Sequence, residues 1–174
     1  MRTWKLAVTV STIACTIAVA HAQAPKSPHE TTKATIDGAA ISVTYGRPSV
    51  RGRKIMGALV PYGTVWRTGA DEATTLTTDK AIQIGGTSVP AGTYTLYTLP
   101  GESAWQLIVN KQTGQWGTEY DQKQDLARIP LKKNATAAPV EQLTISVDKN
   151  PAGGGLLKIA WENTELTAPV TVKQ

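Results

Sequence analysis

Residues 143–161 read Leu-Thr-Ile-Ser-Val-Asp-Lys-Asn-Pro-Ala-Gly-Gly-Gly-Leu-Leu-Lys-Ile-Ala-Trp, and this stretch decides the fold class. At each end of it, apolar residues alternate with polar or small residues, which is the period of a strand with one buried face. Between the two alternating runs, residues 150–155 contain one proline and three glycines, the residue types of a hairpin loop. The stretch therefore predicts two antiparallel strands joined by a flexible loop.

The same alternation recurs elsewhere in the chain. It is clear at residues 41–45 and again at residues 166–172, where Pro169 marks the strand as an edge or a bulge. Further short strands are predicted between turn residues, at residues 65–68, 74–78, 81–84, 93–99, 105–110 and 126–132. Long helical periodicities are missing, so the chain is expected to be built from strands.

Turn residues separate these predicted strands. Gly85-Gly86 fits a two-residue hairpin, and Pro90-Ala91-Gly92 and Pro100-Gly101 fit tight turns. One helical turn is expected at residues 54–59. Together the pattern predicts an all-β protein, a single antiparallel β-sandwich of jelly-roll-like type, with one long structured loop after the first core strand.

Composition excludes several classes of protein. The chain has 174 residues, of which 41% are hydrophobic and 18% charged. This balance fits one globular domain and excludes both a disordered chain and a protein with many membrane spans. With one cysteine and two histidines, the chain has neither a disulfide scaffold nor a Cys/His cluster for structural zinc.

The first 22 residues have the layout of a secretory signal peptide. A short basic start precedes an uncharged apolar run at residues 6–19, and Ala20-His21-Ala22 offers the small residues that suit cleavage after Ala22. The protein is therefore expected in the periplasm or outside the cell. A permanent membrane anchor and a lipoprotein modified at Cys15 are less favoured alternatives, because the apolar run is short and continues past the cysteine.

Cleavage would change the chemistry available to the chain. Cys15 and His21 leave with the signal, so His29 is the only histidine that remains, and the formal charge falls from +5 to +3. Residues 23–30 are expected to be a flexible leader and residues 31–174 the single domain. A cysteine nucleophile and a multi-histidine metal site are then excluded, and neither a cofactor nor a metal is expected.

Residues 45–74 form the most unusual segment of the chain. Five bases and no acid occur from residue 38 to residue 70, and two acids then follow together. Arginine offers a planar fork of donors for carboxylate or phosphate, and Trp and Tyr faces suit sugar rings. The candidate ligand-binding residues of this segment are Tyr45, Arg47, Arg53, Tyr62, Trp66, Arg67, Asp71 and Glu72.

A structural interpretation competes with the binding one. Arg67 would pair with Asp71 or Glu72, while Arg47 and Arg53 would fasten the loop through backbone carbonyls. The two interpretations differ in one observable property. Binding requires guanidinium groups that converge, unmatched, on an open cavity, whereas bracing requires each of them to be saturated by the protein.

A second polar segment, residues 110–121, follows a predicted strand. Lys111, Trp116 and Tyr120 lie on it between glycines, so it could form a lid or platform for a ligand. The alternative is a loop that covers one end of the sandwich.

Several motifs resemble a known family. They are Tyr-Gly-Arg-Pro-Ser-Val-Arg-Gly-Arg-Lys-Ile-Met-Gly at 45–57, Leu-Val-Pro-Tyr-Gly-Thr-Val-Trp-Arg-Thr-Gly-Ala-Asp-Glu-Ala-Thr at 59–74, Val-Pro-Ala-Gly-Thr-Tyr-Thr-Leu-Tyr-Thr-Leu-Pro-Gly-Glu at 89–102 and Asn-Lys-Gln-Thr-Gly-Gln-Trp-Gly-Thr at 110–118. They are similar to the DUF2911 family over nearly the whole mature chain. The resemblance implies an exported bacterial protein with one β-rich domain, and it carries no catalytic residue. Members usually have Asn where this chain has Asp71.

These observations favour a non-catalytic binding module for a small anionic or saccharide ligand. A structural or interaction domain of the cell envelope is the alternative. A carboxylate-dependent hydrolase or lyase is less favoured, because Asp71 and Glu72 would point to opposite faces of a strand and need a distant acid as partner. The mild charge and the lack of a basic or amphipathic helix indicate no nucleic acid partner, and no membrane attachment after cleavage. The oligomeric state is left open.

Overall fold

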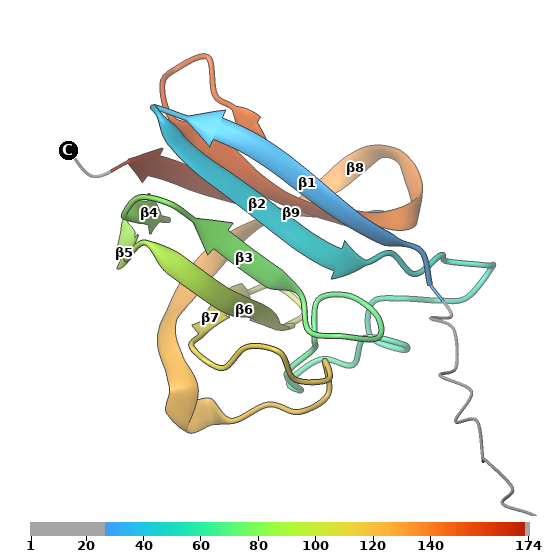
Figure 1. Ribbon diagram of the computed structural model, residues 1–174. Coiled ribbons are helices and arrows are strands. Elements are labelled where there is room, and N and C mark those ends of the chain that lie inside the picture. The colour runs from blue at the N-terminus through green and yellow to red at the C-terminus, as the bar shows by residue number, and fades with distance from the viewer. Residues whose placement is uncertain (1–26, 173–174) are drawn as a thin grey trace, which may run out of the picture.

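The computed structural model describes residues 27–172, which form an all-β fold (Figure 1). The predicted signal peptide and residues 23–26 of the predicted leader lie outside the described residues. The strands are β1 (His29–Ile36), β2 (Ala39–Gly46), β3 (Thr75–Thr78), β4 (Ile82–Ile84), β5 (Thr87–Val89), β6 (Gly92–Leu99), β7 (Trp105–Asn110), β8 (Asp125–Lys149) and β9 (Gly155–Val172). A single 3-10 turn, η1 (Gln122–Gln124), precedes β8, and no helix within 27–172 is long and apolar enough to cross a membrane.

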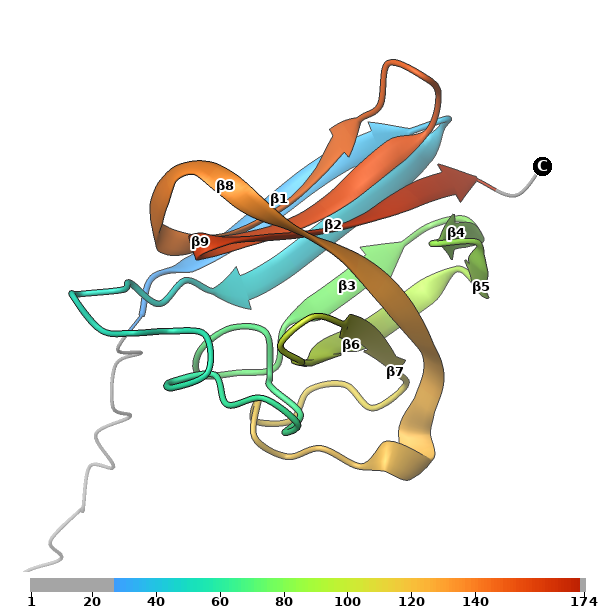
Figure 2. The same cartoon turned by 180° about the vertical axis from the view of Figure 1, so that it is seen from behind.

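The nine strands form one antiparallel sheet in the order β1-β2-β3-β6-β7-β8-β9-β4-β5. This confirms the prediction of an all-β antiparallel protein, while its sandwich and jelly-roll details stay predictions. β8 connects the two parts of the sheet. Its first residues pair with β7, as at Trp105↔Leu131, and from Lys132↔Thr167 onward it pairs with β9. Figure 2 shows β8 crossing diagonally between these neighbours.

Side chains of β1 and β2 cap the edge of β8 that faces away from β9. Thr32 Oγ1 donates to the Ile145 carbonyl at 2.7 Å, and the Ile145 amide donates to Tyr45 Oη at 2.9 Å. Two residues earlier, the Leu143 carbonyl accepts from Arg47 Nε at 2.9 Å. At an open sheet edge, backbone N–H and C=O groups would lack partners. Here side chains supply hydrogen bonds to these groups of β8. These bonds hold β1 and β2 against β8 and fix the start of the loop that follows β2.

The hairpin predictions are confirmed. Gly85-Gly86 connects β4 to β5, and residues 150–154 connect β8 to β9. Pro169 lies where β8 no longer pairs with β9, since the last pair is Lys132↔Thr167, and its carbonyl accepts from the Gly85 amide at 2.8 Å. A residue without an N–H is therefore tolerated there.

Three local predictions are wrong, and a short strand was missed. His29 and Glu30, expected in a flexible leader, begin β1 and pair with Gly46 and Tyr45. The three-residue strand β5 was not predicted. Residues 65–68 are not a strand, and only a single bridge joins Trp66 to Thr98. Residues 54–59 form turns rather than a helical turn, because the chain closes on itself through the Val60 amide and the Ile55 carbonyl at 2.9 Å.

The core lies between the strands and reaches the end of the sheet where β2, β6 and β9 meet the loops. Its largest fully buried side chains include Trp105, Trp161, Tyr45 and Tyr97. Two of these aromatic residues, Trp161 and Tyr97, also form the floor of a cavity at this end. Residues of the core therefore also line the candidate site.

Candidate functional site

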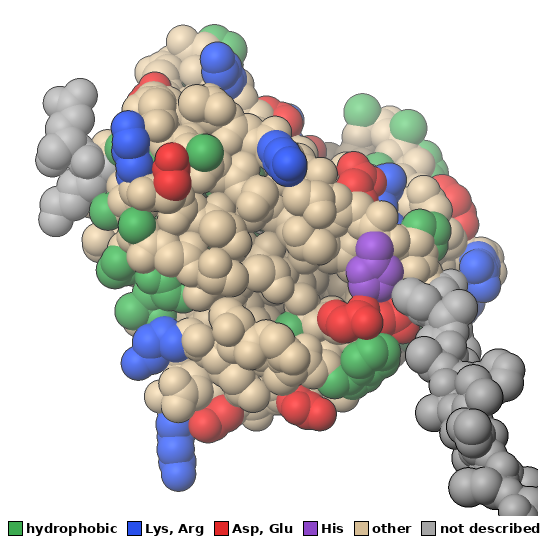
Figure 3. Space-filling model, in the orientation of Figure 1, with side chains coloured by type: hydrophobic (Ala, Val, Ile, Leu, Met, Phe, Trp, Pro, Cys, Tyr) green, Lys and Arg blue, Asp and Glu red, His purple; other side chains and the backbone are tan. Residues whose placement is uncertain are grey.

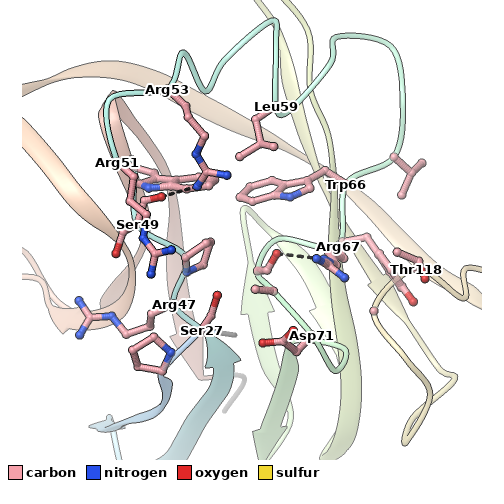
Figure 4. A pocket seen from close by; sticks show the side chains of 18 of the residues that line it. Ser27, Arg47, Ser49, Arg51, Arg53, Leu59, Trp66, Arg67, Asp71 and Thr118 are labelled. Carbon is pink, nitrogen blue, oxygen red and sulfur yellow. Dashed lines mark hydrogen bonds between the residues drawn. The ribbon is translucent and has the colours of Figure 1, made fainter. Parts of the chain in front are cut away.

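A cavity of about 530 Å³ opens where the loop after β2, the loop after β7 and the start of β1 meet (Figure 4). The structure brings together six of the predicted site residues as part of its lining, namely Arg47, Arg53, Trp66, Arg67, Asp71 and Tyr120. Four of the lining residues are arginines, and Asp71 is the one carboxylate among them. The positive charge that the sequence placed in one segment is thus collected around one cavity.

The other predicted site residues lie elsewhere. Tyr45 is a core residue, 1% exposed, and its hydroxyl bonds to the Ile145 backbone. Tyr62 packs against the core, and Glu72, Lys111 and Trp116 are exposed outside the cavity wall. The prediction that these five residues contact the ligand is not supported by their positions.

Two of the predicted arginines act as braces. Arg47 Nε donates to the Leu143 carbonyl, Nη2 donates to Thr144 Oγ1 at 3.0 Å, and Nη1 pairs with Glu30. Arg53 fastens its own loop, with Nε 3.0 Å from the Val50 carbonyl and Nη2 2.6 Å from the Ser49 carbonyl. The structural interpretation is therefore correct for these two side chains.

Two other arginines present unused donors to the cavity. Arg67 Nε donates to the Gly69 carbonyl at 3.2 Å, and within residues 27–172 its terminal nitrogens have no partner. Arg51, which was not among the predicted site residues, makes no side-chain hydrogen bond in that range, although its amide donates to Glu141 Oε1 at 2.9 Å. Their side chains come from opposite sides of the cavity in Figure 4. The predicted pairing of Arg67 with Asp71 or Glu72 does not occur.

Aromatic side chains form the apolar part of the wall. Trp66 stacks on Trp161 with ring centroids 5.8 Å apart and an interplanar angle of 14°. Trp66 is held by two backbone bonds to Thr98, at 2.8 and 2.9 Å, and Trp161 Nε1 donates to the Glu141 carbonyl at 3.3 Å. The stack is fixed from both sides and gives the cavity a rigid surface.

The tyrosines of the cavity are neutral hydrogen-bonding groups. Burial, followed by the hydrogen bond to Asp125, raises the pKa of Tyr120 to about 12. Its hydroxyl donates to Asp125 Oδ2 at 2.7 Å and accepts from Arg128 Nη2 at 2.8 Å. Burial also raises the pKa of Tyr97, which meets Tyr120 edge to face at 4.9 Å. Neither phenol adds negative charge at neutral pH.

Asp71 lies in a tight loop before β3. Its φ of 63° is in the left-handed region, as is the φ of 54° at Thr68, where a β-branched residue is strained. The chain turns here, so both acids face one histidine: His29 Nε2 is 3.7 Å from Asp71 Oδ2 and 3.2 Å from Glu72 Oε2. Figure 3 shows this histidine, in purple, against acidic side chains. The expectation that the two acids point to opposite faces of a strand is wrong, because they are not on a strand.

Sequence reasoning missed several lining residues. Arg51 belongs to the basic segment and differs from its neighbours in no sequence property, so only the structure separates it from the bracing arginines. Tyr97 and Trp161 belong to regular strands, where alternation predicts core rather than cavity. Within the described range, no group of three His, Cys, Asp or Glu side chains is arranged to hold a metal ion.

A comparison with protein-family models found a match for this chain. The DUF2911 family, described as "Protein of unknown function", matches residues 27–170. The comparisons with curated proteins and with solved structures found no match. The chain belongs to the DUF2911 family.

Proposed function

We propose that this member of the DUF2911 family is an exported, non-catalytic binding module that takes a small anionic ligand into the cavity. The observation that carries the proposal is Arg67. Its terminal guanidinium nitrogens line the cavity and have no partner within residues 27–172. This guanidinium group is half-buried and open to solvent, and a carboxylate or phosphate that enters the cavity can bind it with two parallel hydrogen bonds.

The surroundings of Arg67 support an anion over a neutral ligand. Arg51 adds a second unpaired guanidinium from the other side, whereas the charges of Arg47 and Arg53 are held in place by backbone and side-chain bonds. Only one carboxylate opposes these four cations in the lining. Low-dielectric walls strengthen such a field, so anions are concentrated there. The volume also suits a single small molecule, since ligand pockets span roughly 300–1,000 Å³.

The remaining parts of the proposal rest on the sequence pattern. Export is proposed from the signal-peptide layout of residues 1–22, and a sandwich scaffold from the spacing of the strands. The bracing roles of Arg47 and Arg53 favour a rigid frame around the cavity. A rigid frame serves binding because less ordering entropy is lost when the ligand enters.

A ligand screen by thermal unfolding tests the proposal. The protein is purified from cells that express the full chain and is heated with inorganic phosphate, acetate, D-glucuronate or D-glucose. We expect at least one anion to raise Tm, D-glucose to have little effect, and Arg67→Gln to lose the stabilisation.

The matched control is Lys158→Gln, which removes a cation that pairs with Asp148 outside the cavity lining. This variant keeps the ligand-induced shift. The proposal is wrong if no anion stabilises the protein, or if Arg67→Gln responds to anions as the unaltered protein does.

A further inference from the structure

An unused acceptor lies in the cavity together with the unused donors. The Asp71 carboxylate accepts no hydrogen bond within residues 27–172: its Oδ2 is buried near His29, and the rest of the side chain, which is 13% exposed, is the part open to the cavity. His29 Nε2 lies closer to Glu72 Oε2, at 3.2 Å, than to Asp71 Oδ2, at 3.7 Å. A buried carboxylate oxygen without a donor is costly, so the site lacks a hydrogen-bond donor at this position.

Asp71 and Arg67 are held side by side without pairing. The Gly117 amide donates to the Asp71 carbonyl at 3.0 Å. A Cβ on Gly117 would lie 2.7 Å from Arg67 Cδ and 2.8 Å from the Asp71 carbonyl oxygen, so both residues pack directly on this glycine. The left-handed conformation of Asp71 further limits where its carboxylate can turn. A fixed cation and a fixed anion that do not meet can both be satisfied by a ligand placed between them.

We infer that the ligand is a polyhydroxy carboxylic acid, such as a sugar acid, and this inference rests on the proposed function. The carboxylate of the ligand accepts from Arg67, and a neighbouring hydroxyl donates to the Asp71 carboxylate. The carbon skeleton lies against Trp66, which lines the same cavity. A bare anion would satisfy Arg67 and leave Asp71 unpaired next to it, where the two negative charges repel. A neutral sugar would satisfy Asp71 and leave Arg67 unpaired.

Isothermal titration of the full-chain protein tests this inference. The probes are D-glucuronate, D-galacturonate and D-gluconate, compared with cyclohexanecarboxylate, which has no hydroxyl, and with D-glucose, which has no carboxylate. We expect at least one sugar acid to bind about tenfold more tightly than either comparison compound, since a hydrogen bond to a charged group is worth that much or more.

Asp71→Gly supplies the decisive variant, because glycine adopts the left-handed conformation freely and removes the carboxylate. We expect this variant to bind the sugar acids more weakly and cyclohexanecarboxylate more tightly, so that the tenfold preference disappears. Glu102→Gln is the matched control, since Glu102 is exposed and lies outside the cavity lining, and it keeps the preference.

The outcomes separate this inference from the proposed function. If cyclohexanecarboxylate binds as tightly as the sugar acids, or if Asp71→Gly keeps the preference, the inference is overturned while anion binding stands. If no carboxylate binds and no anion raises Tm, both fail.

Discussion

Gly46 lies at the end of β2, directly under the loop that carries Asp71. A Cβ at this position would lie 2.3 Å from the Ala70 carbonyl oxygen, so a side chain has no room unless the loop moves. We expect Gly46→Ala to lower the free energy of unfolding by about 2 kcal/mol, the usual cost of forcing an extra methyl group into a packed site. It should also weaken ligand binding, because Ala70 is next to Asp71. Urea unfolding measures the first effect and calorimetric titration the second.

Ser42→Ala, on the same strand but half exposed, is the control for Gly46→Ala and should change the free energy of unfolding by less than about 0.5 kcal/mol. A Gly46→Ala protein as stable as this control would show that the loop after β2 is not held against β2.

Tyr120 makes the stability of the protein depend on alkaline pH. Its pKa is raised from 10.0 to about 12 in the folded protein, chiefly by burial and then by Asp125. The stabilisation is therefore fully present below the unfolded pKa of 10.0 and is lost as the pH rises toward 12. Urea unfolding across this pH range should show a steeper fall for the unaltered protein than for Tyr120→Phe. Equal slopes would contradict the assigned environment of the phenol.

At the scale of residues, the sequence selected six of the residues that line the cavity. Arg67 and Asp71 were selected because bases and acids cluster in one segment. The role of Arg47 could not be read there, because its bracing depends on the carbonyl of Leu143, which is far from it in the sequence. The left-handed turn at Asp71 was also hidden, since aspartate adopts that conformation only where the surrounding fold imposes it.

The element that most depends on side-chain bonds is β8. Arg47 bonds to Leu143 and Thr144 on this strand and pairs with Glu30 on β1. We expect Arg47→Ala to lower the free energy of unfolding by about 2–3 kcal/mol, because the Leu143 carbonyl loses its partner and an ion pair between strands is removed. Arg47→Lys should recover only part of this loss, since lysine lacks the planar fork. Urea unfolding provides the measurement.

Arg53→Ala serves as the matched arginine control. Arg53 is exposed and bonds only to carbonyls of its own loop, so its loss should cost less than about 1 kcal/mol. If the two substitutions proved equally mild, the edge of β8 would not be held by Arg47.

At the scale of elements, the alternation of apolar with polar residues predicted the strands that bury one face. It missed the strands in which this alternation is not clear. β1 was not predicted, because it is rich in threonine and its side chains are mostly exposed or half buried. β8 was predicted as two strands, at residues 126–132 and 143–147. The structure joins them into one long strand whose pairing with β9 is irregular between Ala135 and Val140, where the sequence is rich in alanine and contains a proline.

For the whole molecule, the export part of the proposal predicts a processed chain. Mass spectrometry of the protein recovered from the periplasm or the medium of a bacterial host should give a chain that begins at Gln23. A protein that keeps Met1 and stays in the cytoplasm would contradict export, and it would leave the cavity and its ligand class untouched.

The molecule as a whole combines a side-chain-capped sheet with one cationic cavity, and its charge is unevenly shared. Residues 38–70 carry five bases and no acid, although the entire chain has 18 Lys and Arg against 13 Asp and Glu. The fold gathers Arg51 and Arg67 of this segment beside the Trp66–Trp161 stack. An anion that is attracted by these arginines would therefore also contact the Trp66–Trp161 stack.

The central claim is that an anion enters this cavity, and the indole N–H signals of the four described tryptophans test it most directly. In a heteronuclear NMR titration with D-glucuronate, the signals of Trp66 and Trp161 should shift saturably, whereas those of Trp105 and Trp116, which are not part of the lining, should stay in place. Arg67→Gln should abolish the shifts. If Trp66 and Trp161 stay unmoved by D-glucuronate and by inorganic phosphate alike, the cavity is not the binding site that the arginines indicate.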